Sequence, residues 1–468
     1  MRNLILVVYD TARADSFEPW GAPRGATPVA AQLAREGSAP PHVVAPSNWT
    51  LPSHASMFTG MLPGALGLTS GIKKGSKVGV NSRALLEERS DRVLAEFLRR
   101  RGYATGGISA NPWIHEVNGF ATGFDLFHSI RGVERKPPGR SLRTRLEWAL
   151  DAWRARADDG ATTAGHVLRK WMDDRRTDTP FFWFVNLMEC HGPYLPPRPF
   201  NDLSGLQRIG AALDAARYQT PEGSYRVTVG ERRMPEDTVR RTRHLYARAI
   251  FQMDAWLGGI TEELDRRGML EETLIVLASD HGENLGEDGM VGHLLSMSER
   301  LLRVPLIFSS PVEPGHAGPV SLAELPAMIA GALGIEDHPW RDEVRPGGAA
   351  VSQVAGQIML PEKEALARAW GIPDEAIRRM ASSMTSATDG RFKLIRDEGG
   401  ERLYDLGSDP AESRPLDAAT EPAAAALRAA IDEVESYAPA EPATETPAAT
   451  GDDEAAELEE RLRQLGYI

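Results

Sequence analysis

Stretches of continuous apolar residues recur along the chain, and each ends in polar side chains. Residues 4–9, 179–187 and 273–279 are such stretches, rich in Leu, Ile, Val and Phe. Unbroken apolar runs of this length are typical of strands that are buried on both faces of a parallel sheet. Segments with helical character lie between them, at residues 90–101, 146–176 and 235–267. This alternation predicts an α/β/α sandwich around a mostly parallel central sheet.

Two later parts of the chain depart from this pattern. Residues 198–235 are polar and predict a loop-rich lid or rim. Residues 380–388, 392–396 and 402–406 predict short antiparallel strands, with Gly390 and residues 398–400 as turns. Residues 438–452 have a linker composition, and residues 454–465 predict a last short helix. We therefore expect a main catalytic domain over residues 1–375, a small α+β subdomain over 376–435, and a linker with a terminal helix over 436–468.

Polar residues that could bind a metal follow two of the predicted strands. Asp10 comes after the first strand, and Asp280 and His281 come after the strand at 273–279. The carboxyl ends of parallel strands meet at one edge of a sheet, where α/β proteins place their ligands. Two carboxylates and an imidazole, joined by a hydroxyl from Thr50, can hold one divalent cation. Such an oxygen-rich set favours Ca²⁺, Mg²⁺ or Mn²⁺ over Zn²⁺.

Thr50 lies where a loop turns into a predicted helix. Pro52 suits the first turn of that helix and Gly60 suits its end. The free N–H groups at a helix start favour an anion, so this hydroxyl is well placed to attack a sulfate or phosphate. A metal would lower the pKa of the hydroxyl and neutralise the ester oxygens. Taken alone, however, Thr50 is more typical of an ordinary N-cap.

Composition limits the classes of function. The net charge of the 468 residues is −13, which argues against nucleic acid as a partner. Cys190 is the only cysteine, so an internal disulfide and a multi-cysteine zinc site are excluded. No apolar run approaches the roughly eighteen residues of a membrane span, and the first run is too short for a signal peptide. We expect a cytoplasmic protein without a membrane span.

A series of short motifs resembles the sulfatase family of the alkaline phosphatase superfamily. The motifs occur in the order Asn-Leu-Ile-Leu-Val-Val-Tyr-Asp at 3–10, Thr-Leu-Pro-Ser-His-Ala-Ser-Met-Phe-Thr-Gly at 50–60, His-Gly-Pro-Tyr at 191–194 and Ser-Asp-His-Gly-Glu at 279–283. Residues 392–395, 403–406 and 409–412 also resemble the carboxyl-terminal pattern of that family. The likeness extends from about residue 3 to residue 415.

The resemblance implies a role for each matching position. It implies an alkaline-phosphatase-like sandwich and metal-dependent hydrolysis of a small anionic sulfate or phosphate ester, such as that of a carbohydrate. The implied metal ligands are Asp10, Thr50, Asp280 and His281. The implied catalytic residues are Thr50 as nucleophile, His191 and His293. The implied substrate-binding residues are His54, Asn111 and Lys393. A purely structural role for His191 and His293 stays an open alternative.

The sequence also departs from the family. Sulfatases use a cysteine that is oxidised to formylglycine, with a proline two residues later and an arginine two residues after that. Here Thr50, Pro52 and His54 occupy these positions, so we expect no formylglycine. Thr11 follows Asp10 where many sulfatases carry a second aspartate. The aldehyde hydrate of formylglycine releases sulfate by collapse of a hemiacetal. A sulfated threonine cannot do this, so water must attack its sulfur directly. A phosphorylated threonine can be hydrolysed by in-line attack of water.

The sequence thus predicts a metal-dependent hydrolase of sulfate or phosphate esters with a threonine nucleophile. Two alternatives remain. One is a phosphodiesterase or phosphotransferase that acts on a phosphorylated sugar or lipid headgroup. The other is a non-catalytic relative that binds an anion without turning it over.

Overall fold

A computed structural model describes residues 2–69, 80–130, 142–293, 295–340, 344–355 and 361–437. Its centre is a six-stranded sheet in the order β4-β3-β5-β1-β6-β9. The strands are β1 (Asn3–Tyr9), β3 (Ala104–Ser109), β4 (Leu126–Ser129), β5 (Phe181–Leu187), β6 (Thr273–Ala278) and β9 (Leu306–Phe308). The five strands other than β9 run parallel, and β9 pairs antiparallel with β6. The predicted mostly parallel sheet is confirmed.

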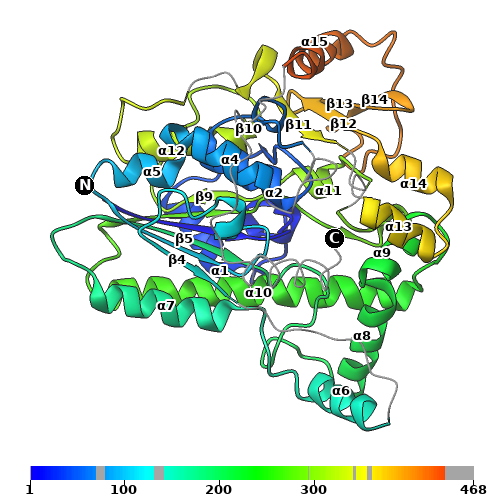
Figure 1. Cartoon of the computed structure of the whole chain (residues 1–468), viewed down its shortest axis with the longest axis horizontal. Coiled ribbons are helices and arrows are strands. Elements are labelled where there is room, and N and C mark those ends of the chain that lie inside the picture. The colour runs from blue at the N-terminus through cyan, green and yellow to red at the C-terminus, as the bar shows by residue number, and fades with distance from the viewer. Residues whose placement is uncertain are drawn as a thin grey trace.

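Helices cover both faces of this sheet (Figure 1). One layer contains α1 (Pro28–Glu36), α7 (Ala161–Asp174) and α10 (Glu236–Arg266). The opposite layer contains α2 (Thr50–Thr59), α4 (Val80–Glu88), α5 (Leu94–Arg99) and α12 (Leu325–Ala332). The α/β/α sandwich that the sequence predicts is therefore present.

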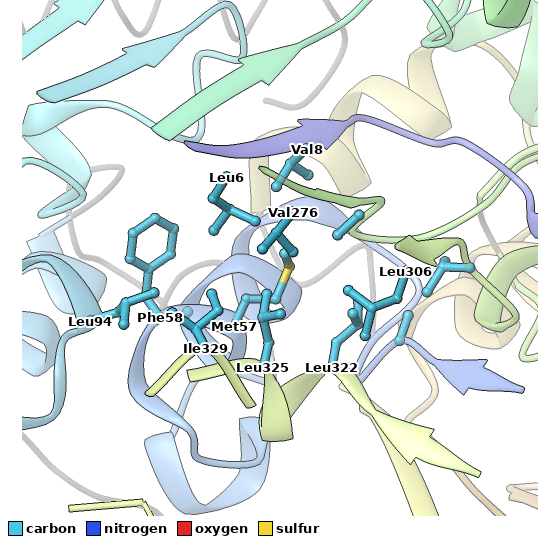
Figure 2. Close-up of a cluster of buried hydrophobic side chains, with 14 of the residues drawn as sticks. Leu6, Val8, Met57, Phe58, Leu94, Val276, Leu306, Leu322, Leu325 and Ile329 are labelled. Carbon is cyan, nitrogen blue, oxygen red and sulfur yellow. The ribbon is translucent and has the colours of Figure 1, made fainter. Parts of the chain in front are cut away.

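Strand β1 shows why its apolar run folds into the middle of the sandwich. Its side chains alternate between the two faces, because successive strand residues point in opposite directions. Leu4, Leu6 and Val8 belong to the core under α2 and α12, whereas Ile5, Val7 and Tyr9 belong to the core under α7 and α10. Figure 2 shows the first core, where Leu6, Val8 and Val276 of the sheet face side chains of α2 and α12 that include Met57, Phe58, Leu325 and Ile329.

A second sheet forms the carboxyl-terminal part of the described chain. Its antiparallel strands are β11 (Ala350–Val354), β12 (Met384–Thr388), β13 (Phe392–Asp397) and β14 (Gly400–Asp405), and α15 (Ala423–Glu435) packs on it. The three predicted strands are confirmed. The sheet gains β11 from a segment before residue 376, and α13 (Pro361–Ala369) and α14 (Asp374–Ala381) lie between β11 and β12. The predicted linker and terminal helix after residue 437 lie outside the described residues.

The expectation of a loop-rich segment at 198–235 is wrong. Two helices occupy most of it, α8 (Gly205–Tyr218) and α9 (Pro221–Thr228). Ser204 and Thr220 cap their starts, and Ser204 forms a capping box with Gln207. The predicted helix at 146–176 is likewise divided into α6 (Leu142–Arg154) and α7. None of the described helices is long and apolar enough to cross a membrane.

The remaining α-helices and strands are short. They are α3 (Pro63–Leu66), α11 (Glu299–Leu302), β2 (Val43–Val44), β10 (Val320–Ser321), β7 (Asn284–Leu285) and β8 (Val291–Gly292). β7 and β8 form a small hairpin directly after the Asp280–His281 pair. This hairpin brings the following residues back towards the carboxyl edge of the main sheet.

Candidate active site

Asp10, Asp280 and His281 come together at the carboxyl edge of the main sheet. Asp10 directly follows β1, and Asp280 lies two residues after β6, the parallel neighbour of β1. One ligand atom from each of the three residues lies within 4.8 Å of the others, and all three side chains are fully buried. The adjacency of β1 and β6 is therefore what assembles this cluster.

Each carboxylate in the cluster keeps one oxygen that accepts no hydrogen bond from the described residues. Asp10 Oδ2 accepts a 2.5 Å hydrogen bond from Asn111 Nδ2, while Asp10 Oδ1 accepts none. Asp280 Oδ1 accepts from the N–H groups of Thr11 and His281, while Asp280 Oδ2 accepts none. Burial raises the pKa of Asp10 to about 7, with the charge of Asp280 adding to it. Burial likewise raises the pKa of Asp280 to about 7.

This arrangement fits a divalent cation. Buried carboxylate oxygens without hydrogen-bond donors are costly unless a positive charge compensates them. His281 is suited to complete the set, because its Nδ1 lies 2.9 Å from the carbonyl oxygen of Gly282, which leaves Nε2 as the ligand atom. Burial holds the pKa of His281 well below its usual value, so the imidazole is in the neutral form that binds metals.

Thr50 lies beside this cluster. Its Oγ1 is 3.4 Å from His281 Nε2 and 3.4 Å from Asn111 Nδ2. The N-cap of α2 is Trp49, and Thr50 is the first helical residue, so the alternative that Thr50 serves only as N-cap does not hold. Gly60 ends the helix with a left-handed φ of 63°, as predicted. The hydroxyl of Thr50 therefore contacts Asn111 and His281 and does not cap the helix.

The rings of His281, His293 and His191 lie next to one another in the site. The His293 ring centroid lies 4.6 Å from that of His281 and 5.7 Å from that of His191. Glu283 Oε1 lies 3.2 Å from His293 Nδ1. Burial opposes a charged imidazole, but Glu283 raises the pKa of His293 above its usual value. Sequence reasoning gave Glu283 no role, although it ends the Ser-Asp-His-Gly-Glu motif.

The three predicted substrate-binding residues occupy different positions. Asn111 lies in the cluster, between Asp10 and Thr50. His54 is fully buried in α2, with Nδ1 3.0 Å from the carbonyl oxygen of Thr50 and 3.4 Å from Asp280 Oδ2, and burial lowers its pKa to about 3. The structure does not bring Lys393 into the cluster. Its ammonium lies 2.9 Å from Glu299 Oε1 and 3.0 Å from Glu412 Oε1, with 1% of the side chain exposed.

Comparison with known proteins shows which family and which solved structures the chain is similar to. A family model described as Sulfatase matches residues 2–335. The choline-sulfatase of Rhizobium meliloti is 25% identical over 93% of this chain and 88% of its own length. The phosphonate monoester hydrolase of Agrobacterium radiobacter superposes with a TM-score of 0.58 at 19% identity, covering 93% of this chain and 95% of that one. BT4656, solved in complex with its substrate D-glucosamine-2-N,6-O-disulfate, superposes with a TM-score of 0.62 at 16% identity, covering 93% and 98%.

Proposed function

The chain belongs to the sulfatase family and is an ester hydrolase, and from that premise we propose that Thr50 is its nucleophile in a metal-dependent reaction. The single observation that carries the proposal is the position of Thr50 Oγ1, 3.4 Å from His281 Nε2 and beside two buried carboxylates, each of which keeps one oxygen without a hydrogen-bond donor among the described residues. A divalent cation bound by Asp10, Asp280 and His281 would lower the pKa of the Thr50 hydroxyl and offset the negative charge of the ester oxygens.

The residues of the chain perform the remaining steps. Asn111 donates to Asp10 Oδ2 and lies within reach of Thr50 Oγ1, so it orients the nucleophile. Thr50 releases its hydroxyl proton to solvent, Oγ1 forms a bond to the sulfur or phosphorus, and the bond from that atom to the alcohol oxygen breaks. His293 or His191 gives a proton to the departing oxygen. Water then attacks the sulfur or phosphorus of the threonine ester, and the bond to the threonine oxygen breaks. One proton of the water goes to the threonine oxygen and the other to the histidine, so the inorganic anion leaves and both residues are restored.

We further propose that the substrate is a small sulfated or phosphorylated carbohydrate. The similar fold of BT4656, whose substrate is a sulfated glucosamine, supports this class. A threonine nucleophile favours the phosphorylated substrate over the sulfated one. Water can displace the threonine oxygen from phosphorus by in-line attack, whereas a sulfated threonine has no hemiacetal whose collapse would release sulfate.

Matched nitrophenyl esters test the proposal. Sulfate, phosphate monoester and phosphate diester are each assayed after chelation and after addition of Ca²⁺, Mg²⁺ or Mn²⁺. We expect hydrolysis of at least one ester that needs the metal and that falls by about 10³-fold or more in Thr50→Ala. Thr59→Ala is the matched control, because Thr59 is a buried threonine of the same helix whose hydroxyl donates to the Ala55 carbonyl. Full turnover by Thr50→Ala would refute the nucleophile assignment.

A further inference from the structure

Thr11 has a backbone conformation that is rare for its residue type. It follows Asp10, is fully buried, and has a φ of 61°. A β-branched residue in the left-handed region is a conformational outlier, because its branched Cβ crowds the backbone. Such strain persists only where the surrounding structure holds the residue in place, and it concentrates at functional sites.

Two side-chain hydrogen bonds hold Thr11 in this conformation. Its Oγ1 donates to the carbonyl oxygen of Cys190 at 2.6 Å, just beyond β5. Its own carbonyl oxygen accepts from the hydroxyl of Tyr246 in α10 at 2.7 Å. The next residue, Ala12, donates its N–H to Ser279 Oγ at 2.8 Å. The turn is therefore attached to three separate parts of the fold.

The consequence of this conformation is the direction of one N–H group. The N–H of Thr11 donates to Asp280 Oδ1 at 3.1 Å. The N–H of His281 donates to the same oxygen at 2.9 Å. Both donors therefore occupy Oδ1, and Oδ2 is the oxygen of Asp280 that is left for a cation.

We propose that Thr11 is a positioning residue for the cation site: its hydroxyl holds a strained turn whose N–H fixes which oxygen of Asp280 binds the metal. The inference rests on the proposed function, because it concerns the same site. Thr11 acts through its backbone, since its hydroxyl is already engaged by the Cys190 carbonyl. Asp280 is a proposed ligand, and the partners that orient such ligands typically contribute 10–100-fold to metal affinity.

Four substitutions of Thr11 distinguish the effect of losing the hydroxyl from the effect of the backbone strain. Thr11→Ser keeps the donor. Thr11→Val keeps the branched shape and the strain but has no donor. Thr11→Ala also has no donor, and its smaller, unbranched side chain is less strained at this φ. Thr11→Gly also lacks the donor, but glycine adopts a positive φ without strain. If the hydroxyl serves to hold the turn, glycine should restore the metal affinity that valine loses.

The measurement is the affinity of the purified metal-free protein for Mn²⁺ by titration calorimetry. We expect Thr11→Val to weaken binding about 10-fold or more, Thr11→Ala to weaken it less, and Thr11→Ser and Thr11→Gly to stay within threefold of the wild type. Thr59→Val is the matched control, because it removes a buried threonine hydroxyl that donates to a carbonyl elsewhere. That control should leave the affinity unchanged.

Three outcomes would overturn the inference. Thr11→Gly could bind Mn²⁺ as weakly as Thr11→Val, which would assign the hydroxyl a direct role. Thr11→Val could bind as tightly as the wild type, and if it fails to fold, Thr11→Ala provides the same comparison. Alternatively, the wild type and Asp280→Asn could bind Mn²⁺ equally. That last result would remove the proposed cation site as well, whereas the first two would leave it intact.

Discussion

The ammonium of Lys393 lies 2.9 Å from Glu299 Oε1, and this ion pair joins the small sheet to the main domain. Lys393 belongs to β13, and Glu299 begins α11. Glu412 Oε1 lies 3.0 Å from the same ammonium. Two residues after Glu299, the carbonyl of Leu301 accepts a hydrogen bond from the N–H of Gly282, next to His281. The buried pair thus supports the segment that follows the proposed metal ligands Asp280 and His281.

Replacing Lys393 with methionine should destabilise the protein by about 3–5 kcal/mol, because two buried carboxylates lose their cation. Urea unfolding measures the change. Lys170→Met is the control: Lys170 forms an exposed pair with Asp174, and its loss should leave the free energy of unfolding nearly unchanged. A Lys393→Met protein of normal stability with a raised KM for its ester would contradict this reasoning and support the sequence-based expectation of substrate binding.

Replacing Asn111 with alanine should reduce both metal affinity and kcat, each by about 10–100-fold. The amide donates to Asp10 Oδ2 at 2.5 Å and lies 3.4 Å from Thr50 Oγ1, so its loss frees both groups to move. Mn²⁺ titration and single-turnover hydrolysis measure the two effects. Asn118→Ala removes a buried amide that donates to the Trp113 carbonyl and should change neither quantity appreciably. A kcat for Asn111→Ala equal to that of the wild type would show that the amide does not orient the nucleophile.

The sequence predicts the centre of the fold well, because local pattern determines it. The unbroken apolar run of β1 could only be buried on both faces, and the structure places its alternate residues in two cores. The helices α8 and α9 were not predicted. Their signals are a capping box at Ser204 and an N-cap at Thr220, which are short-range features in a polar segment. Their position depends on packing against α10 and β8, which no local pattern contains.

In the site, too, local pattern predicts some features and tertiary packing determines the others. Asp10 and Asp280 follow parallel strands, so their convergence could be predicted from the sequence. The surroundings of Lys393 could not, because Glu299 and Glu412 are distant in the chain and only the tertiary fold brings them together. The positive φ of Thr11 was also not predictable, since threonine rarely adopts it and the bonds that hold it come from other elements.

Replacing Glu189 with glutamine should stabilise the protein at pH 8. Burial raises the pKa of Glu189 to about 8, with nearby Asp159 adding to it, and its Oε2 accepts no hydrogen bond from the described residues. Between the ordinary value of 4.5 and about 8, the folded state keeps a proton that the unfolded state has lost. The wild type therefore loses stability as pH rises through this range, and the uncharged glutamine does not.

Urea unfolding at several pH values measures this difference. We expect the variant to exceed the wild type by about 1–3 kcal/mol at pH 8 and to approach it near pH 4.5. Glu263→Gln is a control with the opposite pH dependence. Arg267 and Arg266 hold the pKa of Glu263 below its usual range. The stability that the charge of Glu263 contributes is therefore present above the ordinary pKa of a glutamate and is lost as pH falls. Parallel profiles for wild type and Glu189→Gln would show that Glu189 is not a buried carboxyl of raised pKa.

Metal removal should destabilise the wild type much more than Asp280→Asn. Without a cation, Asp10 and Asp280 bring two carboxylates into one buried cluster, so the neutral amide should make the metal-free variant more stable than the metal-free wild type. With Mn²⁺ at 100 times its dissociation constant, the wild type should gain about 2.7 kcal/mol of stability. The variant should gain little, because it has lost a ligand. Thermal unfolding with a chelator and with Mn²⁺ gives both comparisons, and equal stabilisation of the two proteins would place the cation elsewhere.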